Sequence, residues 1–214
     1  MHPPTPVLLI DARWDRPTNY LYAFRIHQLT PYLAAYKVHH LIGPKAVQPG
    51  VDDYIHRNPV RYISGAGHGQ YSSFRGYYDQ IIWQAGRNLS HLKGVIVHLS
   101  SCETGAALGR SMVAAGVTAF WGYAEEFRFF RSPVIPADLH DDPIAGSAIT
   151  MDCLIDIGIL ERKTADEILD IVKDYVNKTI NGLPLISPQR AVLRHNLRHL
   201  VCPATVWGDR TATL

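Results

Sequence analysis

Residues 95–105, Val95-Ile96-Val97-His98-Leu99-Ser100-Ser101-Cys102-Glu103-Thr104-Gly105, place a cysteine directly after a short apolar run. β-branched and apolar residues lead this run, which is typical of a strand buried on both faces of a parallel sheet. Two serines and Cys102 end the strand, and small residues then begin a predicted helix over 105–115. Cys102 is therefore expected in a turn at the carboxyl end of a strand, the edge at which open α/β sheets bind ligands.

A second stretch, Tyr62-Ile63-Ser64-Gly65-Ala66-Gly67-His68-Gly69-Gln70, has the same order of features. A short apolar strand is followed by small residues and then by one histidine, His68, between two glycines. Glycine lets the backbone turn sharply and come close to a substrate. If the two strands are parallel neighbours, His68 and Cys102 lie at the same edge of the sheet.

Strand and helix patterns alternate through residue 122, which predicts a parallel sheet with helices on both faces. The predicted strands cover 6–11, 38–42, 60–64, 95–99 and 117–122, and the helices of this part cover 20–35, where Pro31 kinks or ends the helix, and 105–115. Segment 44–55 is expected to be a poor, short helix or mostly loop, 71–78 a loop or hairpin, and 79–86 either helix or strand. The fold class is therefore α/β, a three-layer α/β/α sandwich.

The C-terminal third is predicted to be helical. Asp142-Pro143 is an N-cap followed by a proline at the first helical position. Thr164 and Glu167 fit a capping box, and Ser187-Pro188 begins a third helix. A last short strand is expected over 205–209.

Length and composition indicate one globular domain, residues 1–214. With 47% hydrophobic and 19% charged residues the chain can bury a core, and a net charge of +2 is too small to indicate a nucleic-acid binder. No run approaches the roughly 20 apolar residues of a membrane span, and the first residues lack the pattern of a signal peptide.

The chain has three cysteines, Cys102, Cys153 and Cys202. A disulfide scaffold needs more cysteines and usually an even number of them. The three cysteines therefore indicate a reducing compartment, so a cytoplasmic location is expected. Cys153 and Cys202 are interpreted as core residues. The histidines show no metal-ligand spacing, and no metal or cofactor is predicted.

A cysteine and a histidine at one sheet edge can perform nucleophilic catalysis. The thiolate is the nucleophile, so the cysteine needs a neighbour that accepts its proton or lowers its pKa, and His68 could do both. A helix beginning just after Cys102 would add positive potential from its unpaired N–H groups. The backbone N–H groups of Gly69 and Cys102 are natural donors to a tetrahedral oxyanion.

These residues resemble the caspase–hemoglobinase class (clan CD) of cysteine peptidases, and within it the branch of separase, gingipain-type and CHAT-domain peptidases. That branch shows Gly-His-Gly, then a small residue before Cys-Glu-Thr-Gly, then Ala-Gly and a Trp-Gly-type strand. The corresponding residues are Gly67-His68-Gly69, Ser101-Cys102-Glu103-Thr104-Gly105, Ala115-Gly116 and Phe120-Trp121-Gly122. The end of the chain, Val206-Trp207-Gly208-Asp209, resembles the closing Gly-Asp-Pro strand of CHAT domains, with Arg210 in place of the proline.

The resemblance covers residues 60–125 well and the rest loosely. It implies an endopeptidase that uses a dyad, with Cys102 as nucleophile and His68 as general acid/base, and that forms a thioester acyl-enzyme. The implied partner is a protein or peptide substrate, and a regulatory protein is compatible with the class. Some relatives place a specificity carboxylate two positions before the cysteine, whereas this chain has Ser100 there.

The preferred residue of the substrate therefore depends on other side chains. Asp11 ends the first strand and either binds a basic substrate residue or forms a helix cap or a salt bridge with Arg13. Glu125 and Glu126 follow the strand over 117–122 and either line the same pocket or form a solvated loop. A basic preference is favoured because of Asp11, while Arg13 and Arg16 offer the opposite, acidic preference through bidentate contacts to carboxylates.

Two other functions remain open at this point. One is a catalytically silent module of the same fold that acts with a partner protein. The other is a doubly wound nucleotide- or flavin-binding domain. The second is disfavoured, because Asp11-Ala12-Arg13-Trp14 after the first strand is not a glycine-rich phosphate loop.

Overall fold

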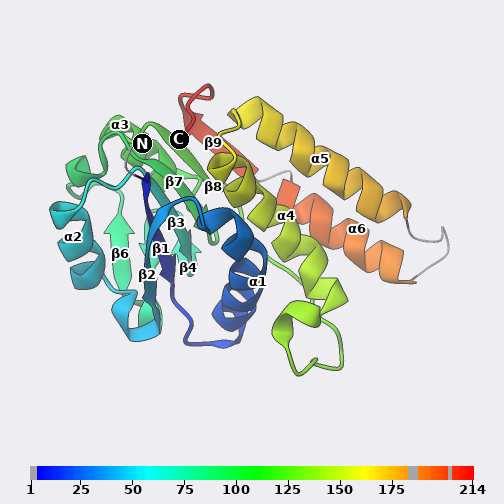
Figure 1. The fold of residues 1–214 in the computed structure, drawn as a ribbon. Helices are drawn as coiled ribbons and strands as arrows, with labels where there is room; N and C mark the ends of the chain where they lie inside the picture. Colours follow the sequence, from blue (N-terminus) through cyan, green and yellow to red (C-terminus); the bar gives the residue numbers. More distant parts are fainter. Residues whose placement is uncertain (1–3, 183–187, 202–203) are drawn as a thin grey trace.

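The computed structural model describes residues 4–182, 188–201 and 204–214. Its main sheet has six strands in the order β2-β1-β3-β7-β8-β9 (Figure 1). The strands are β1 (Pro6–Asp11), β2 (Lys37–Ile42), β3 (Tyr62–Ala66), β7 (Ile96–Ser100), β8 (Ala119–Tyr123) and β9 (Ala204–Gly208). All neighbours pair in parallel except β9, which runs antiparallel to β8. The α/β class and the mostly parallel sheet predicted from the sequence are confirmed.

A second, small antiparallel sheet lies beside the main one. It consists of β4 (His68–Gln70), β5 (Ser73–Arg75) and β6 (Ile81–Gln84) in that order. Segment 71–78 is thus a hairpin and not a loop, and the short apolar run within 79–86 is a strand. Periodicity alone could not decide the second case, because four residues are too few to separate a strand from a helical turn.

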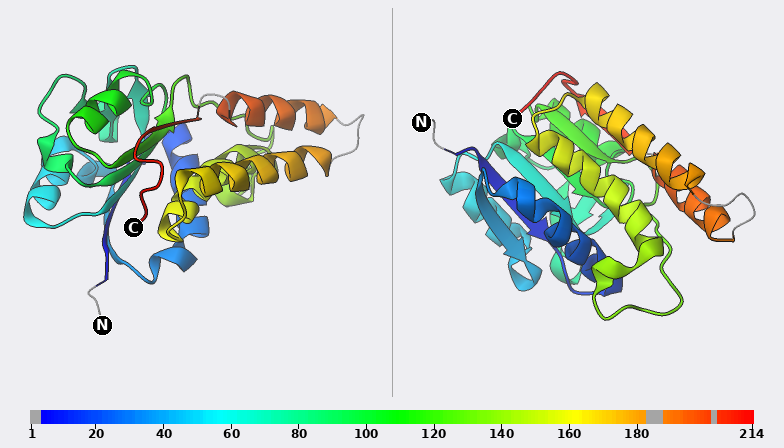
Figure 2. Two further views of the ribbon diagram at one scale, coloured as in Figure 1. Left: turned by 90° about the horizontal axis from the view of Figure 1, so that it is seen from above. Right: turned by 45° about the vertical axis from the view of Figure 1, so that its right-hand side comes forward.

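Helices cover both faces of the main sheet, which gives the predicted three layers (Figure 2). One layer holds α1 (Arg16–Leu33), α4 (Pro143–Leu160), α5 (Ala165–Asn181) and α6 (Pro188–Val201), and the other holds α2 (Gln48–Arg57) and α3 (Ala107–Ala114). Helices α5 and α6 lie side by side and extend beyond the edge of the sheet. Within the described residues, short 3-10 turns connect the elements over Gly43–Lys45, Tyr77–Asp79, Ser90–Leu92 and Leu139–Asp141.

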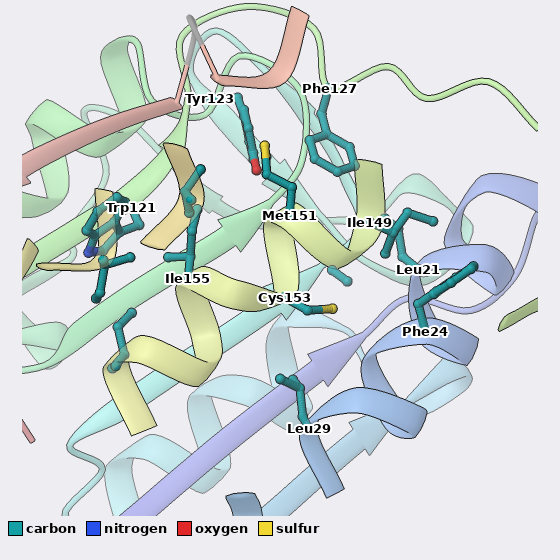
Figure 3. Close-up of a cluster of buried hydrophobic side chains, with 14 of the residues drawn as sticks. Leu21, Phe24, Leu29, Trp121, Tyr123, Phe127, Ile149, Met151, Cys153 and Ile155 are labelled. Atoms are coloured by element: carbon teal, nitrogen blue, oxygen red, sulfur yellow. The ribbon is translucent and has the colours of Figure 1, made fainter. Parts of the chain in front are cut away.

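Two hydrophobic clusters hold these layers together. The larger one packs the sheet against α1 and α4, with Trp121, Phe127 and Met151 among its side chains (Figure 3). The smaller one packs the other face of the sheet against α2, α3 and β6. Cys153 lies in the larger cluster and is fully buried, as expected for a core residue, whereas Cys202 lies outside the described residues.

Capping residues mark the helix starts that the sequence predicted. Asp142 accepts hydrogen bonds from the amides of Ile144 and Ala145 at 2.9 and 3.1 Å at the start of α4. Thr164 and Glu167 form a capping box at the start of α5. Helix α4 is long and apolar enough to cross a membrane by composition, but 72% of that stretch is buried inside the protein, as expected for a core helix.

Three helices differ from the sequence prediction. Helix α1 begins at Arg16, four residues earlier than expected, and Pro31 lies inside its last turn. Helix α2 is a regular helix of ten residues, where a poor, short helix or mostly loop was expected. Helix α3 begins at Ala107 and not at Gly105, because residues 102–106 form turns.

Candidate active site

The register of the central strands brings the two sequence motifs to one edge of the sheet. β3 and β7 are parallel neighbours, and Ala66 at the end of β3 pairs with Ser100 at the end of β7. His68 follows Ala66 by two residues, and Cys102 follows Ser100 by two residues. Both segments therefore leave the sheet at the same level and in the same direction.

Gly69 packs directly against the turn that carries Cys102. A methyl group added at Gly69 would lie 2.1 Å from the carbonyl oxygen of Cys102 and 3.0 Å from its amide nitrogen. The hairpin is also tied to α3, because the carbonyl oxygen of Tyr71 accepts a hydrogen bond from the Ala107 amide at 3.0 Å. Only glycine fits at position 69, and its lack of a side chain lets the two segments meet backbone to backbone.

His68 is held by a carboxylate that the sequence analysis did not select. His68 Nε2 lies 2.7 Å from Asp15 Oδ2, and the histidine side chain is 34% exposed. The other oxygen of Asp15 accepts hydrogen bonds from the backbone amide of Thr18 at 3.1 Å and from its hydroxyl at 2.6 Å, so Asp15 is also the N-cap of α1. Burial alone would raise the pKa of Asp15, but the bonds to Thr18 and His68 lower it below its usual value.

Asp15 could have been found from the sequence through its capping role. Asp15, Pro17 and Thr18 form an N-cap signature, with an acceptor, an early proline and a reciprocal partner at the third helical position. A helix that begins at this signature places Asp15 in the loop after β1, at the edge of the sheet where His68 was expected. Trp14 packs its ring edge against His68, with ring centroids 5.8 Å apart.

Cys102 is half-buried in the turn after β7. Its Sγ lies 3.8 Å from the carbonyl oxygen of Phe127, which accepts the thiol hydrogen. Burial raises the pKa of the Cys102 thiol, and the charge of Glu103 acts in the same direction. The expectation that a helix starting just after Cys102 would provide positive potential was wrong, since α3 begins five residues later, at Ala107.

A cavity of about 510 Å³ lies beside the turn that carries Cys102, although Cys102 itself does not line it. Its lining includes Glu103, Glu125, Glu126 and Arg128. The amide of Glu103 donates to the carbonyl oxygen of Glu125 at 2.8 Å, which holds the two segments together. Arg128 pairs with Glu126, whereas the carboxylates of Glu103 and Glu125 have no ion pair within the described part of the chain.

The prediction that Asp11 binds substrate was wrong. Asp11 is 1% exposed, and its two oxygens contact Arg25 Nε at 3.0 Å and His40 Nε2 at 2.6 Å. A salt bridge was the alternative considered from the sequence, but the partner is Arg25 of α1 and not Arg13. β1 does end at the expected edge, yet the side chain of its last residue points into the layer beneath α1.

Asp11 belongs to a network of buried polar groups between the sheet and α4. Arg25 also binds Asp156 Oδ2 at 2.8 Å, and Asp156 Oδ1 lies 2.8 Å from His98 Nδ1. His98 Nε2 lies 3.3 Å from Asp152 Oδ1, too poorly aligned for a hydrogen bond. Tyr62, Ser64, Ser100 and Tyr123 donate their hydroxyl hydrogens to Asp156 or Asp152.

Comparisons with known proteins support the fold. No protein-family model and no curated protein matches this sequence. The chain is similar in structure to the Arg-specific cysteine proteinase gingipain R, with a TM-score of 0.58 and 12% identity over 96% of this chain and 46% of that one. It is also similar to a complex of the pro- and mature domains of this proteinase from Porphyromonas gingivalis, with a TM-score of 0.55, 11% identity and coverage of 97% and 47%.

A third solved structure, described only as a protease, gives a TM-score of 0.57 and 13% identity over 97% of this chain and 48% of that one. The chain thus spans about half the length of each of these chains. It shares the fold of a cysteine peptidase. The predicted closeness to separase and CHAT domains remains a prediction. Within residues 4–182, 188–201 and 204–214, no group of three or more acidic, histidine or cysteine side chains is arranged to hold a metal ion.

Proposed function

We propose that this chain is a cysteine endopeptidase with Cys102 as nucleophile and His68 as general acid/base. The observation that carries the proposal is the contact between Gly69 and Cys102, which brings the histidine and cysteine segments together backbone to backbone. The same fold occurs in the cysteine proteinase gingipain R, which supports the reaction class.

The geometry suggests a role for each ring nitrogen of His68. Nε2 faces Asp15, and Nδ1 has no hydrogen-bond partner among the described residues. In the proposed reaction Nδ1 takes the thiol proton, and the thiolate attacks the peptide carbonyl carbon. The C–N bond then breaks, the amine leaves with the proton from His68, and water hydrolyses the thioester. Asp15 contacts Nε2 and so orients the ring.

The oxyanion of the tetrahedral intermediate needs preorganised donors. We assign this role to the amides of Gly69 and Cys102, which belong to the two segments in contact. Because Gly69 has no side chain, a substrate carbonyl can approach its backbone closely.

The substrate is proposed to carry a basic residue at the scissile bond. Glu103 and Glu125 line the cavity beside Cys102, and neither is neutralised by an ion pair within the described residues. A lysine or arginine side chain in this cavity would pair with them. This assignment keeps the basic preference expected from the sequence but moves it from Asp11 to Glu125 and its neighbour Glu103.

A catalytically silent module that binds a partner protein is the second candidate. The raised pKa of the Cys102 thiol favours it, because a neutral thiol bonded to the Phe127 carbonyl is a poor nucleophile. Catalysis would require the substrate to displace that contact. The gingipain complex pairs a pro-domain with a mature domain, and by analogy we propose a regulatory protein partner here. We also propose a cytoplasmic location for the chain.

Labelling with peptidyl acyloxymethyl ketones tests the proposal. We expect one covalent adduct per chain, detected by intact mass spectrometry, with faster labelling when the residue before the ketone is arginine or lysine. Cys102→Ala should abolish the adduct. Cys153→Ala is the matched control, because that thiol is fully buried in the core.

Three outcomes separate the candidates. An adduct that survives Cys102→Ala removes this residue from the mechanism. A folded chain that neither labels nor cleaves a fluorogenic peptide library supports the silent module. Faster labelling with aspartate or glutamate before the ketone contradicts the proposed role of Glu125.

A further inference from the structure

Buried polar atoms without partners gather at a second cavity. Five buried side-chain nitrogen or oxygen atoms in the described part of the chain have no hydrogen-bond partner, and three of them belong to Asp52, Trp83 and His91. All three residues line one cavity of about 220 Å³ between α2 and β6. An unsatisfied buried polar group is costly, so three at one cavity indicate that another molecule satisfies them.

The spacing of two of these atoms suits a shared partner. Asp52 Oδ1 and His91 Nε2 lie 3.8 Å apart, which is too far for a direct hydrogen bond but leaves both free to bind one atom of a ligand. The other oxygen of Asp52 already accepts a hydrogen bond from Gln48 Nε2 at 3.2 Å. Burial lowers the pKa of His91, so its imidazole is neutral at pH 7 and can act as an acceptor beside the carboxylate.

The remaining groups indicate the rest of the ligand. Trp83 is 2% exposed and its indole N–H can only donate, so the ligand must offer it an oxygen acceptor. Its ring is fixed by stacking on Phe74, with ring centroids 5.7 Å apart. Arg87 lies at the exposed rim of the cavity, and its guanidinium has no ion pair within the described residues. A carboxylate would satisfy both donors.

We infer that this cavity binds a small zwitterion of the α-amino acid class, with its ammonium group on Asp52 and His91 and its carboxylate on Trp83 and Arg87. The volume of the cavity suits a ligand as small as an amino acid. At 220 Å³ it is smaller than the pockets of roughly 300–1,000 Å³ that bind drug-sized ligands. The cavity contains none of Asp15, His68 and Cys102, so the inference stands whether or not the proposed peptidase activity does.

Thermal shift and calorimetry on the full chain test this inference. Each of the twenty common amino acids is added singly at millimolar concentration, with glycerol and glucose as neutral hydroxyl-bearing probes and zinc chloride as a metal probe. We expect a subset of the amino acids to raise the melting temperature in a saturable way. Asp52→Asn should raise the dissociation constant of the most strongly stabilising amino acid by about tenfold or more, because it removes a charged hydrogen bond.

Asp53→Asn is the matched control, because Asp53 is the next residue of α2 and pairs on the surface with Arg57 at 2.5 Å. It should leave the dissociation constant unchanged. The indole N–H resonance of Trp83, identified by its absence in Trp83→Phe, should move when the amino acid is added to wild-type protein. This second measurement does not depend on how well the Asp52 variant folds.

Several results would overturn the inference. One is that no amino acid changes the melting temperature or the Trp83 resonance, which would mean that water alone fills the cavity. Equal stabilisation by glycerol or glucose would remove the requirement for an ammonium group. Stabilisation by zinc alone would assign Asp52 and His91 to a metal instead.

Discussion

His68 and His98 both contact aspartates, but the two regions differ in burial and in the number of partners. His98 is fully buried, and both its ring nitrogens face carboxylates, those of Asp156 and Asp152. His68 is one-third exposed, and only Nε2 faces a carboxylate, that of Asp15. The pKa of His98 is raised to about 9 by the two carboxylates, against the effect of burial. A histidine held in that way remains charged and cannot exchange protons with a substrate at pH 7.

A contact between a histidine and an aspartate is therefore not by itself evidence of a catalytic pair. Around His98 the buried charged groups face charges of opposite sign, and these ion pairs link the sheet to α4. The His68 ring is one-third exposed, its Nδ1 has no hydrogen-bond partner among the described residues, and the next residue, Gly69, packs against the Cys102 turn. The proposed proton transfer uses this nitrogen. Four predictions test the two regions and the cavity near Cys102, from the largest expected effect to the smallest.

The largest expected effect is on stability and follows from Asp156→Ala. This change leaves Arg25 and His98 without a shared carboxylate in a buried site, so we expect the free energy of unfolding to fall by about 3–5 kcal/mol. Urea denaturation measures it. Asp166→Ala is the control, because its ion pair with Arg210 is exposed and contributes less than about 1 kcal/mol. Equal effects of the two substitutions would show that the buried network is not a structural link.

The second effect is a dependence of stability on pH. The folded-state pKa of His98 is raised from about 6.5 to about 9, so its contribution is complete below pH 6.5 and is lost as pH rises toward 9. The loss should be at most roughly 3 kcal/mol. Burial lowers the pKa values of His39 and His91, so they act below pH 6.5 and in the opposite direction. Urea denaturation at pH 6.5, 7.5 and 8.5 checks this, and a constant free energy would contradict it.

The third effect is on activity and follows from Asp15→Asn. Asparagine caps helices as well as aspartate does, so stability should change by less than about 1 kcal/mol. The substitution replaces the carboxylate oxygen that contacts His68 Nε2 and so loosens the orientation of the ring, and the labelling rate of Cys102 should fall about 10- to 100-fold. Thr18→Ala is the control, and the opposite result is expected for it. It weakens the cap but leaves the contact between Asp15 and His68, so it should lower stability and retain the rate.

The smallest effect concerns selectivity and follows from Glu125→Gln. Removing one of two carboxylates from a partly open cavity should reduce the preference for basic over neutral substrates by about two- to fivefold. Peptides that differ only at the residue before the scissile bond measure it. Glu161→Gln at the end of α4, remote from the cavity lining, is the control. If the preference for basic substrates is unchanged, Glu125 does not contribute to it.

Much of the fold could be predicted because hydrophobic periodicity and capping are local signals. The strands β1, β2, β7 and β8 and the starts of α4 and α5 could be recognised from their own residues. The strands β5 and β6 were harder, because each has three or four residues and depends on its neighbours for pairing. Helix α2 could be predicted only as a poor, short helix or loop for a similar reason, since only Val51 and Ile55 of its ten residues are buried.

Some residues of the candidate site could likewise be predicted from local patterns, and others could not. His68 and Cys102 could be chosen because each follows an apolar strand and lies among small residues. Asp11 was chosen for the same reason and was wrong, because a strand end does not determine on which side of the sheet its last side chain lies. Asp15, four residues later, is the carboxylate that meets His68.

By itself, the sequence determined the order of strands and helices, the parallel sheet and the two motifs that end at its edge, because these depend on side-chain patterns over a few residues. The N-cap signature of Asp15 is local, but only the tertiary structure decided that this carboxylate meets His68, that Asp11 is paired with Arg25, and that the Cys102 thiol has a raised pKa. Those outcomes depend on burial and on contacts between residues far apart in the chain, and pairing energies of this kind have no signature in a local pattern.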